Sequence, residues 1–88
     1  MNTLKSVFWE YPELTDEQHL RQVLEENRTR EDRRMYLWIL RRFLEYGRAA
    51  DTFRFFSNEE IAASLNILRL SAYSSAKWHR LMEVYRAP

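Results

Sequence analysis

The stretch MYLWILRRFLEYG, residues 35–47, decides the fold. Its apolar side chains cover more than one face of a helix, whereas a helix at the surface of a globular protein carries a single apolar stripe. We therefore expect a central helix, contacted on two sides, that begins near residue 30. The TRED segment at 29–32 has the form of a helix start, with acids where the helix dipole favours them. The expected centre of the core comprises Trp38, Ile39, Leu40 and Phe43.

Gly47 leaves two interpretations of the end of this helix. Glycine adopts the left-handed conformation without penalty and often ends a helix. The three-or-four spacing of apolar residues nevertheless continues past Gly47 to Phe53, so a single kinked helix over 30–56 fits nearly as well. An internal glycine would cost such a helix about 1 kcal/mol. We favour a break at Gly47.

Helix starts divide the rest of the chain. Thr15 opens a capping-box pattern that ends at Gln18 and predicts a helix over 16–27. Ser57-Asn58-Glu59-Glu60 is the strongest pattern of this kind and predicts a helix over 58–68. A last helix, over 74–86, begins at Ser71 or Ser74.

The composition agrees with an all-α fold. One Gly and two Pro leave little material for tight hairpins, and no long alternation of apolar and polar residues indicates a strand. The 88 residues fit one helical domain, 1–88, whose first 14 residues form an aromatic lead segment. We expect a small bundle of four to five short helices, in which the last pair has a helix-turn-helix-like pattern.

Composition also bounds the class of protein. There is no Cys for disulfides or thiolate metal sites, no apolar run long enough to span a membrane and no signal peptide. We expect a cytoplasmic protein that does not bind membranes. The net charge of +1 predicts no strong overall attraction to nucleic acid.

The segment EIAASLNILRLSAYSSAKWHRL, residues 60–81, is similar to the helix-turn-helix of bacterial DNA-binding regulators. Its first helix would pack Ile61 and Leu65, and Asn66 would occupy a left-handed turn position. The second helix would bury Trp78, Leu81, Met82 and Tyr85 on one face. The candidate DNA-contacting residues are Arg69, Ser71, Ser74, Ser75, Lys77, His79 and Arg80.

The same segment also fits two ordinary packed helices. Leu68, Arg69 and Leu70 lengthen the connection beyond that of the compact motif, and no Gly occupies the turn. The basic residues form a small set, so a monomer would bind DNA weakly and with a steep salt dependence. A homodimer, which the sequence leaves open, would double the contact surface.

Taken whole, the chain resembles a group of small uncharacterised bacterial proteins. The resemblance lies in Phe8-Trp9-Glu10, the segment HLRQVLE at 19–25, Arg69-Leu70-Ser71, and Trp78. Several members are encoded beside nucleotidyltransferase-type toxins of the abortive-infection class, which implies an antitoxin-like or accessory role with such a toxin as the protein partner. The chain departs from the group in its longer middle, 41–56, and in lacking Pro soon after Ser71.

The lead segment offers a second candidate interaction site. Phe8, Trp9 and Tyr11 lie in VFWEY, and Trp and Tyr are over-represented among residues that dominate interface energies. They are therefore candidate partner-docking residues. In the alternative interpretation, Phe8 covers the bundle while Trp9 faces away from it.

The sequence contains no pattern that predicts catalysis or a cofactor. The two histidines, His19 and His79, have no second ligand at helical spacing, and Ser and Thr residues are mostly accounted for as caps. One Gly does not supply a phosphate-binding loop. We expect a non-enzymatic adaptor or regulatory protein without metal or cofactor, and the alternative is a DNA-binding transcriptional regulator that uses residues 58–86.

Overall fold

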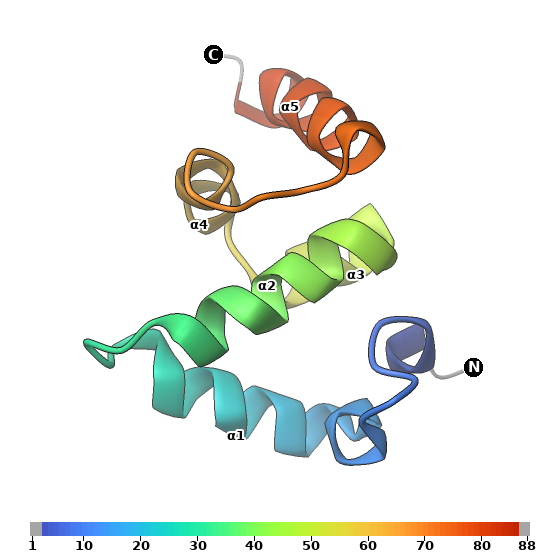
Figure 1. The fold of residues 1–88 in the computed structure, drawn as a ribbon, viewed down its shortest axis with the longest axis vertical. Helices are drawn as coiled ribbons and strands as arrows, with labels where there is room; N and C mark the ends of the chain where they lie inside the picture. Colours follow the sequence, from blue (N-terminus) through green and yellow to red (C-terminus); the bar gives the residue numbers. More distant parts are fainter. Residues whose placement is uncertain (1–2, 87–88) are drawn as a thin grey trace.

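A computed structural model describes residues 3–86 of the chain. This part of the chain forms two short 3-10 helices and five α-helices and contains no strand, so the all-α prediction is confirmed (Figure 1). The elements in order are η1 (Thr3–Ser6), η2 (Pro12–Thr15), α1 (Glu17–Arg28), α2 (Arg34–Tyr46), α3 (Ala49–Phe55), α4 (Asn58–Ser64) and α5 (Ala72–Arg86).

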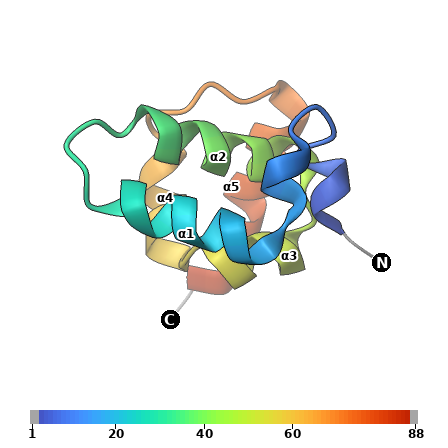
Figure 2. The ribbon, with the colours of Figure 1, turned by 90° about the horizontal axis from the view of Figure 1, so that it is seen from below.

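Helix α2 crosses the middle of the molecule, as the apolar content of residues 35–47 predicts. Figure 1 places α1 and the lead segment on one side of α2, and α4 and α5 on the other. Seen from below, α1 lies in front of α2 (Figure 2). Ile39, Leu40 and Phe43 are fully buried, whereas Trp38 is only half-buried and is an edge residue of the core rather than its centre.

The buried apolar side chains form a single cluster to which every helix contributes. The lead segment and α1 supply Leu4, Val7, Phe8, Leu14, Leu20 and Leu24; α2 supplies Tyr36, Ile39, Leu40, Phe43 and Leu44; the rest of the chain supplies Phe55, Phe56, Ile61, Trp78 and Met82. The Trp78 indole N–H donates to the Leu44 carbonyl at 2.8 Å, so the most buried tryptophan also has its polar atom satisfied.

The N-cap of α1 is Asp16, one residue after the predicted cap, Thr15. The side chain of Asp16, not Thr15, accepts hydrogen bonds from the backbone N–H groups of Gln18 and His19, at 2.9 and 3.3 Å. The Thr15 hydroxyl instead donates to the Pro12 carbonyl at 2.6 Å, within η2. Thr15 therefore belongs to the preceding turn.

The predicted start of the central helix near residue 30 is wrong. Thr29 is the C-cap of α1, so it is not available to open α2. Residues 29–33 connect the two helices, and α2 begins at Arg34, whose backbone N–H donates to Asp32 at 3.1 Å. The chain reverses direction between α1 and α2, and residues 29–33 form the connection. A local capping pattern does not indicate how long such a connection is.

The break at Gly47 is confirmed, but its reason is different from the predicted one. Gly47 has φ −90° and ψ 161°, an extended conformation and not a left-handed one. A Cβ at this position would lie 2.8 Å from the carbonyl oxygen of Phe43. Glycine is therefore favoured because the backbone comes close to the last turn of α2.

Helix α4 starts as predicted but ends earlier, and α5 starts two residues before the predicted 74. Ser57 and Glu60 form a complete capping box at the start of α4. Helix α4 stops at Ser64, and residues 65–68 form turns instead of continuing the helix to 68. Helix α5 starts at Ala72, where the Ser71 hydroxyl accepts from the Ser74 N–H at 3.2 Å, so Ser71 rather than Ser74 is the start.

Candidate partner-binding groove

An open groove of about 910 Å³ lies between η2, α1 and the first turns of α2. One wall belongs to α1, which presents His19, Val23 and Asn27 at i, i+4 and i+8. Residues at this spacing share one face of a helix, so they form a continuous stripe. His19 is exposed, Val23 is half-buried and Asn27 is 8% exposed, with its amide donating to the Val23 carbonyl at 2.8 Å.

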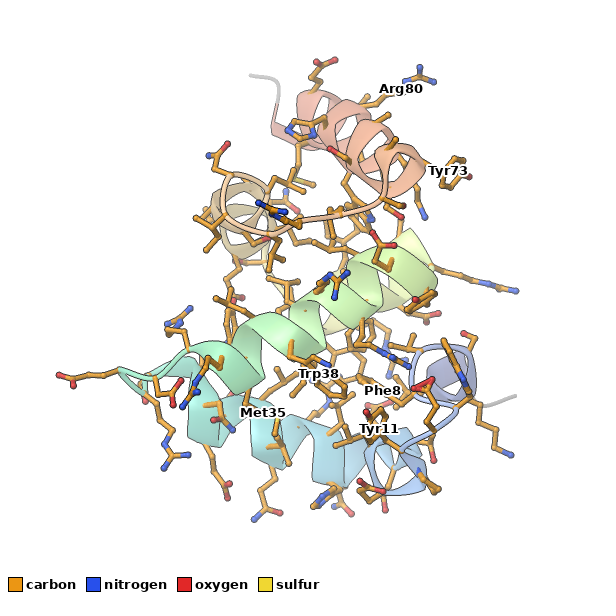
Figure 3. The ribbon with its side chains drawn as sticks, viewed as in Figure 1. Phe8, Tyr11, Met35, Trp38, Tyr73 and Arg80 are labelled. Carbon is orange, nitrogen blue, oxygen red and sulfur yellow. The ribbon has the colours of Figure 1, made fainter. Side chains whose placement is uncertain are left out.

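The opposite wall is apolar and partly aromatic. Met35 and Trp38, one turn apart on α2, face the groove, and Tyr11 and Leu14 contribute from the lead segment. The rings of Tyr11 and Trp38 meet edge to face with centroids 5.0 Å apart. Figure 3 shows Met35, Trp38 and Tyr11 gathered between α2 and the α1 side of the molecule. Met35 and Tyr11 remain 46% and 37% exposed.

The two ends of the groove differ in charge. Glu13 lies at the end formed by η2, whereas Arg30, Asp32 and Arg34 lie at the end formed by the α1–α2 connection. Arg34 pairs with Asp32 at 2.8 Å, and this contact lowers the pKa of the Asp32 carboxyl to about 2. The Asp32 carboxylate therefore stays ionised and is paired, and the two arginines and one aspartate that line this end give it a net charge of +1.

The three docking residues predicted in the lead segment have separate environments. Phe8 is fully buried against Trp38 and Phe43, so its assignment to a docking surface is corrected: it is a core residue. Tyr11 lines the groove. Trp9 is 55% exposed and lies outside the groove, edge to face with Tyr46 at 5.0 Å.

Arg42 holds this lead segment against α2. Its guanidinium donates to the Val7 carbonyl at 2.6 and 2.9 Å, pairs with Glu10 at 3.2 Å and lies 4.5 Å from the ring centroid of Trp9. The side chain is only 14% exposed. Arg42 therefore fixes the backbone that carries Tyr11 into the groove.

The candidate DNA-contacting residues of α5 and its approach are only partly on the surface. Arg69, Ser71, His79 and Arg80 are exposed, and Tyr73 and Arg80 project from α5 at the far end of the molecule from the groove (Figure 3). Ser75 and Lys77 are half-buried, and the Lys77 ammonium lies 5.5 Å from the Trp78 ring centroid.

Two of the helix-turn-helix expectations are wrong. Ser74 is 3% exposed, because it lies on the side of α5 that packs on the core, so it is not a phosphate contact. Asn66 does not adopt the left-handed conformation, since no residue in 3–86 has a positive φ. The connection 65–71 also exceeds the three-to-four-residue turn of the motif. Trp78 and Met82 are buried as predicted, Leu81 is half-buried, and the Tyr85 side chain lies outside the described residues.

A separate polar cluster joins four helices, α1 to α4. Glu60 accepts from the Tyr36 hydroxyl at 2.7 Å and from Arg28 at 2.9 Å, and Arg28 also donates to the Phe55 carbonyl. Burial alone would raise the pKa of Glu60, but hydrogen bonds from Ser57, Tyr36 and Arg28 lower it overall. Burial and the bond to Glu60 raise the pKa of Tyr36. Each group has a partner, so the cluster cross-links the helices.

Sequence reasoning did not identify most of the groove. Trp38 was expected at the centre of the core and Met35 on the apolar surface of the central helix, and Asn27 and Arg30 carried no functional prediction. The available signal was the excess of apolar residues in 35–44, which covers more helix surface than a core of this size buries. That signal does not say which residues remain exposed.

Comparison with known proteins adds no assignment: no protein-family model, no curated protein and no solved structure matches the chain. Within residues 3–86, no helix is long and apolar enough to cross a membrane. The same part of the chain has no group of three His, Cys, Asp or Glu residues placed to hold a metal ion.

Proposed function

We propose that the protein is a non-enzymatic adaptor or regulatory protein that binds another protein at the groove. The observation that carries the proposal is the exposure of Met35 and Tyr11 beside Trp38, on a surface already hollowed between two helices. Exposed apolar side chains that gather on one concave surface are typical of interaction sites. Trp, Tyr and Met are enriched in the cores of such interfaces.

The specific form that we propose is an antitoxin-like role. It rests on the resemblance of Phe8-Trp9-Glu10, residues 19–25 and the Arg69-Leu70-Ser71 segment to proteins encoded beside nucleotidyltransferase-type toxins. In this form, the toxin is the protein that occupies the groove. Trp9 and Tyr46 would then extend the contact surface beyond the groove itself.

Site-specific photo-crosslinking in the native host tests this proposal. A photoreactive phenylalanine analogue replaces Met35 in one variant and Glu83 in a control. Glu83 is exposed on α5 and does not line the groove. We expect one dominant crosslinked protein at position 35 that is absent at position 83, and mass spectrometry identifies it. A nucleotidyltransferase would support the antitoxin-like form.

Equal background crosslinking at both positions would contradict a groove partner. The result is interpretable because Met35 is half exposed, so the analogue does not replace a core residue. Circular dichroism of both variants checks that the helical fold is retained.

A second candidate function, DNA binding through α4 and α5, is favoured by the exposure of Arg69 and Arg80 near the start and along the outer side of α5. Phosphate contacts from such residues position a protein on DNA. We expect Lys77→Ala with Arg80→Ala to abolish this binding and to leave the fold intact. Fluorescence anisotropy with the upstream DNA of the gene, at about 50 and 200 mM salt, measures it. Unchanged affinity in the double variant would exclude this second function.

A further inference from the structure

We infer that the groove receives an amphipathic helix of the partner protein, with the N-terminus of that helix at Glu13 and its C-terminus at Arg30 and Arg34. The inference rests on the proposed function, since it describes the segment by which the partner binds. It adds the secondary structure and the direction of that segment.

The dimensions of the groove favour a helix. The stripe from His19 to Asn27 spans eight residue-to-residue steps of α1, or about 12 Å at 1.5 Å per step. Apolar residues at i, i+3 or i+4, and i+7 of a partner helix cover about the same length and all lie on one face. Two turns of a helix would therefore contact both walls of the groove over their full length.

The alternative of an added β-strand lacks a template. Strand addition requires the open edge of a sheet, because main-chain hydrogen bonds supply much of its affinity. The described residues contain no strand. The walls of the groove are helices whose backbone groups are already paired internally, so they offer side chains and not backbone to the partner.

The chemistry of the walls suits an apolar helix face. Val23, Met35 and Trp38 offer aliphatic, thioether and aromatic surface, and Met adapts easily to the shape of a partner side chain. Asn27 is 8% exposed and its amide donates to the Val23 carbonyl at 2.8 Å, so it adds little polar surface to the α1 wall.

The charges at the two ends determine the direction. A helix carries about half a positive charge at its N-terminus and half a negative charge at its C-terminus. Glu13 attracts the first and Arg30 the second. The C-terminus of α1 and the N-terminus of α2 both lie at the Arg30 end, so their opposite helix dipoles offset each other and the side-chain charges set the difference between the two ends. The partner helix would thus run parallel to α1 and antiparallel to α2.

Selection from a phage-displayed library of random 16-residue peptides tests the inference without knowledge of the partner. The full-length protein is the target, and the Met35→Glu variant is the counter-selection. We expect enriched peptides to carry apolar residues at i, i+3 or i+4, and i+7. We also expect Met35→Glu to weaken their binding at least tenfold.

The direction is measured with the best of these peptides, made with a nitroxide label at either end. A label at the N-terminus should broaden the NMR signals of Glu13 and His19, and a label at the C-terminus those of Arg30 and Arg34. Glu13→Lys and Arg30→Glu should each weaken binding about two- to fivefold, which is the size of a helix-dipole effect. Glu83→Lys, on the exposed surface of α5 and outside the groove, should leave the affinity unchanged.

Three outcomes would overturn the inference. They are enriched peptides with an alternating or proline-rich extended pattern, the reverse pattern of broadening, and no enrichment over the counter-selection. These outcomes are distinguishable from failure of the proposed function. Crosslinking of a partner at position 35, together with extended peptides, would keep the function and reject the helix.

Discussion

At the scale of single residues, the carboxylate of Glu60 connects α4 to α1 and α2. It closes the capping box of α4 with Ser57, accepts from Tyr36 of α2 and pairs with Arg28 of α1. Its side chain is 27% exposed, so these contacts are partly shielded from solvent. Hydrogen bonds to a charged partner contribute about 1.5–3 kcal/mol when they are shielded in this way.

We predict that Glu60→Gln lowers the free energy of unfolding by about 1.5–3 kcal/mol at neutral pH. The pKa of Glu60 is lower in the folded protein than its ordinary 4.5, so the unfolded chain binds the proton first. The stabilisation that the Glu60 carboxylate contributes is therefore fully present above pH 4.5. It is lost as the pH falls below 4.5 and through the lower pKa of the folded protein. The free energy of unfolding, measured by urea denaturation between pH 3 and 7, should decrease less with falling pH in the variant than in the wild-type protein.

Glu25→Gln is the matched control, because Glu25 also pairs with Arg28 but is 73% exposed. A surface pair of this kind contributes about 0.5 kcal/mol or less. Some acid dependence should remain in both variants, since Arg34 also lowers the pKa of Asp32, and Arg54 and Arg21 lower that of Glu17. Equal losses for Glu60→Gln and Glu25→Gln would contradict the cross-linking role of Glu60.

Contacts of single residues were predictable only where both partners are close in the sequence. The Ser57 capping box follows from four adjacent residues, and it was found. Phe8 and Trp9 were expected to face opposite ways in one of two interpretations, but the choice depends on Phe43 and Arg42, more than 30 positions away. The partners of Glu60 also come from α1 and α2, so no local pattern indicates them.

At the scale of elements, the break between α2 and α3 depends on how close the backbone of Gly47 comes to Phe43. The Gly47 N–H donates to the Phe43 carbonyl at 2.8 Å, and the chain then turns away in an extended conformation. The sequence indicated a break because glycine ends many helices. It indicated the wrong conformation, because the left-handed stop is only one of the reasons for a glycine at a helix end.

We predict that Gly47→Ala lowers the free energy of unfolding by about 1–3 kcal/mol, the usual cost of forcing extra atoms into a packed site. The added Cβ would lie 2.8 Å from the Phe43 carbonyl oxygen and 3.2 Å from its ring, so the end of α2 must shift. This loss exceeds the gain of about 0.4–1 kcal/mol from a less flexible unfolded chain. Thermal unfolding followed by circular dichroism measures the difference.

Gly47→Asn separates the two reasons for the glycine. Asparagine tolerates the left-handed conformation, so it would rescue a left-handed stop. With φ at −90°, asparagine gains nothing and meets the same carbonyl oxygen. It should therefore destabilise the protein at least as much as alanine, and a near-neutral Gly47→Asn would contradict the steric explanation.

At the scale of the whole molecule, α2 is the central helix, with α1 and the lead segment on one side and α4 and α5 on the other (Figure 1). The sequence predicted the apolar surface of this helix and the all-α fold class. The groove was not predicted, because it arises where η2, α1 and α2 leave part of that surface uncovered. Which part stays uncovered depends on the length of the 29–33 connection and on the Arg42 contacts with Val7, both of which are tertiary features.

Because one apolar cluster includes side chains from the lead segment to α5, we predict that the protein unfolds in a single cooperative transition. Trp78 reports on α5 when Trp9→Phe and Trp38→Phe leave it as the only tryptophan. Its fluorescence in urea should then change at the same midpoint as the far-ultraviolet circular dichroism of all helices. The buried Trp78 indole, bonded to Leu44 of α2, makes α5 depend on α2 for its stability.

If the Trp78 fluorescence changed at a lower urea concentration than the circular dichroism, α4 and α5 would form a separate, less stable unit. That result would change the functional argument as well, because a C-terminal pair that opens independently could bind DNA without disturbing the groove. A coincident midpoint means that any ligand of α5 also stabilises α2, and hence the wall formed by Met35 and Trp38. Amide exchange at Leu24, on the far side of α2, should then reach the same limiting free energy as exchange at Trp78.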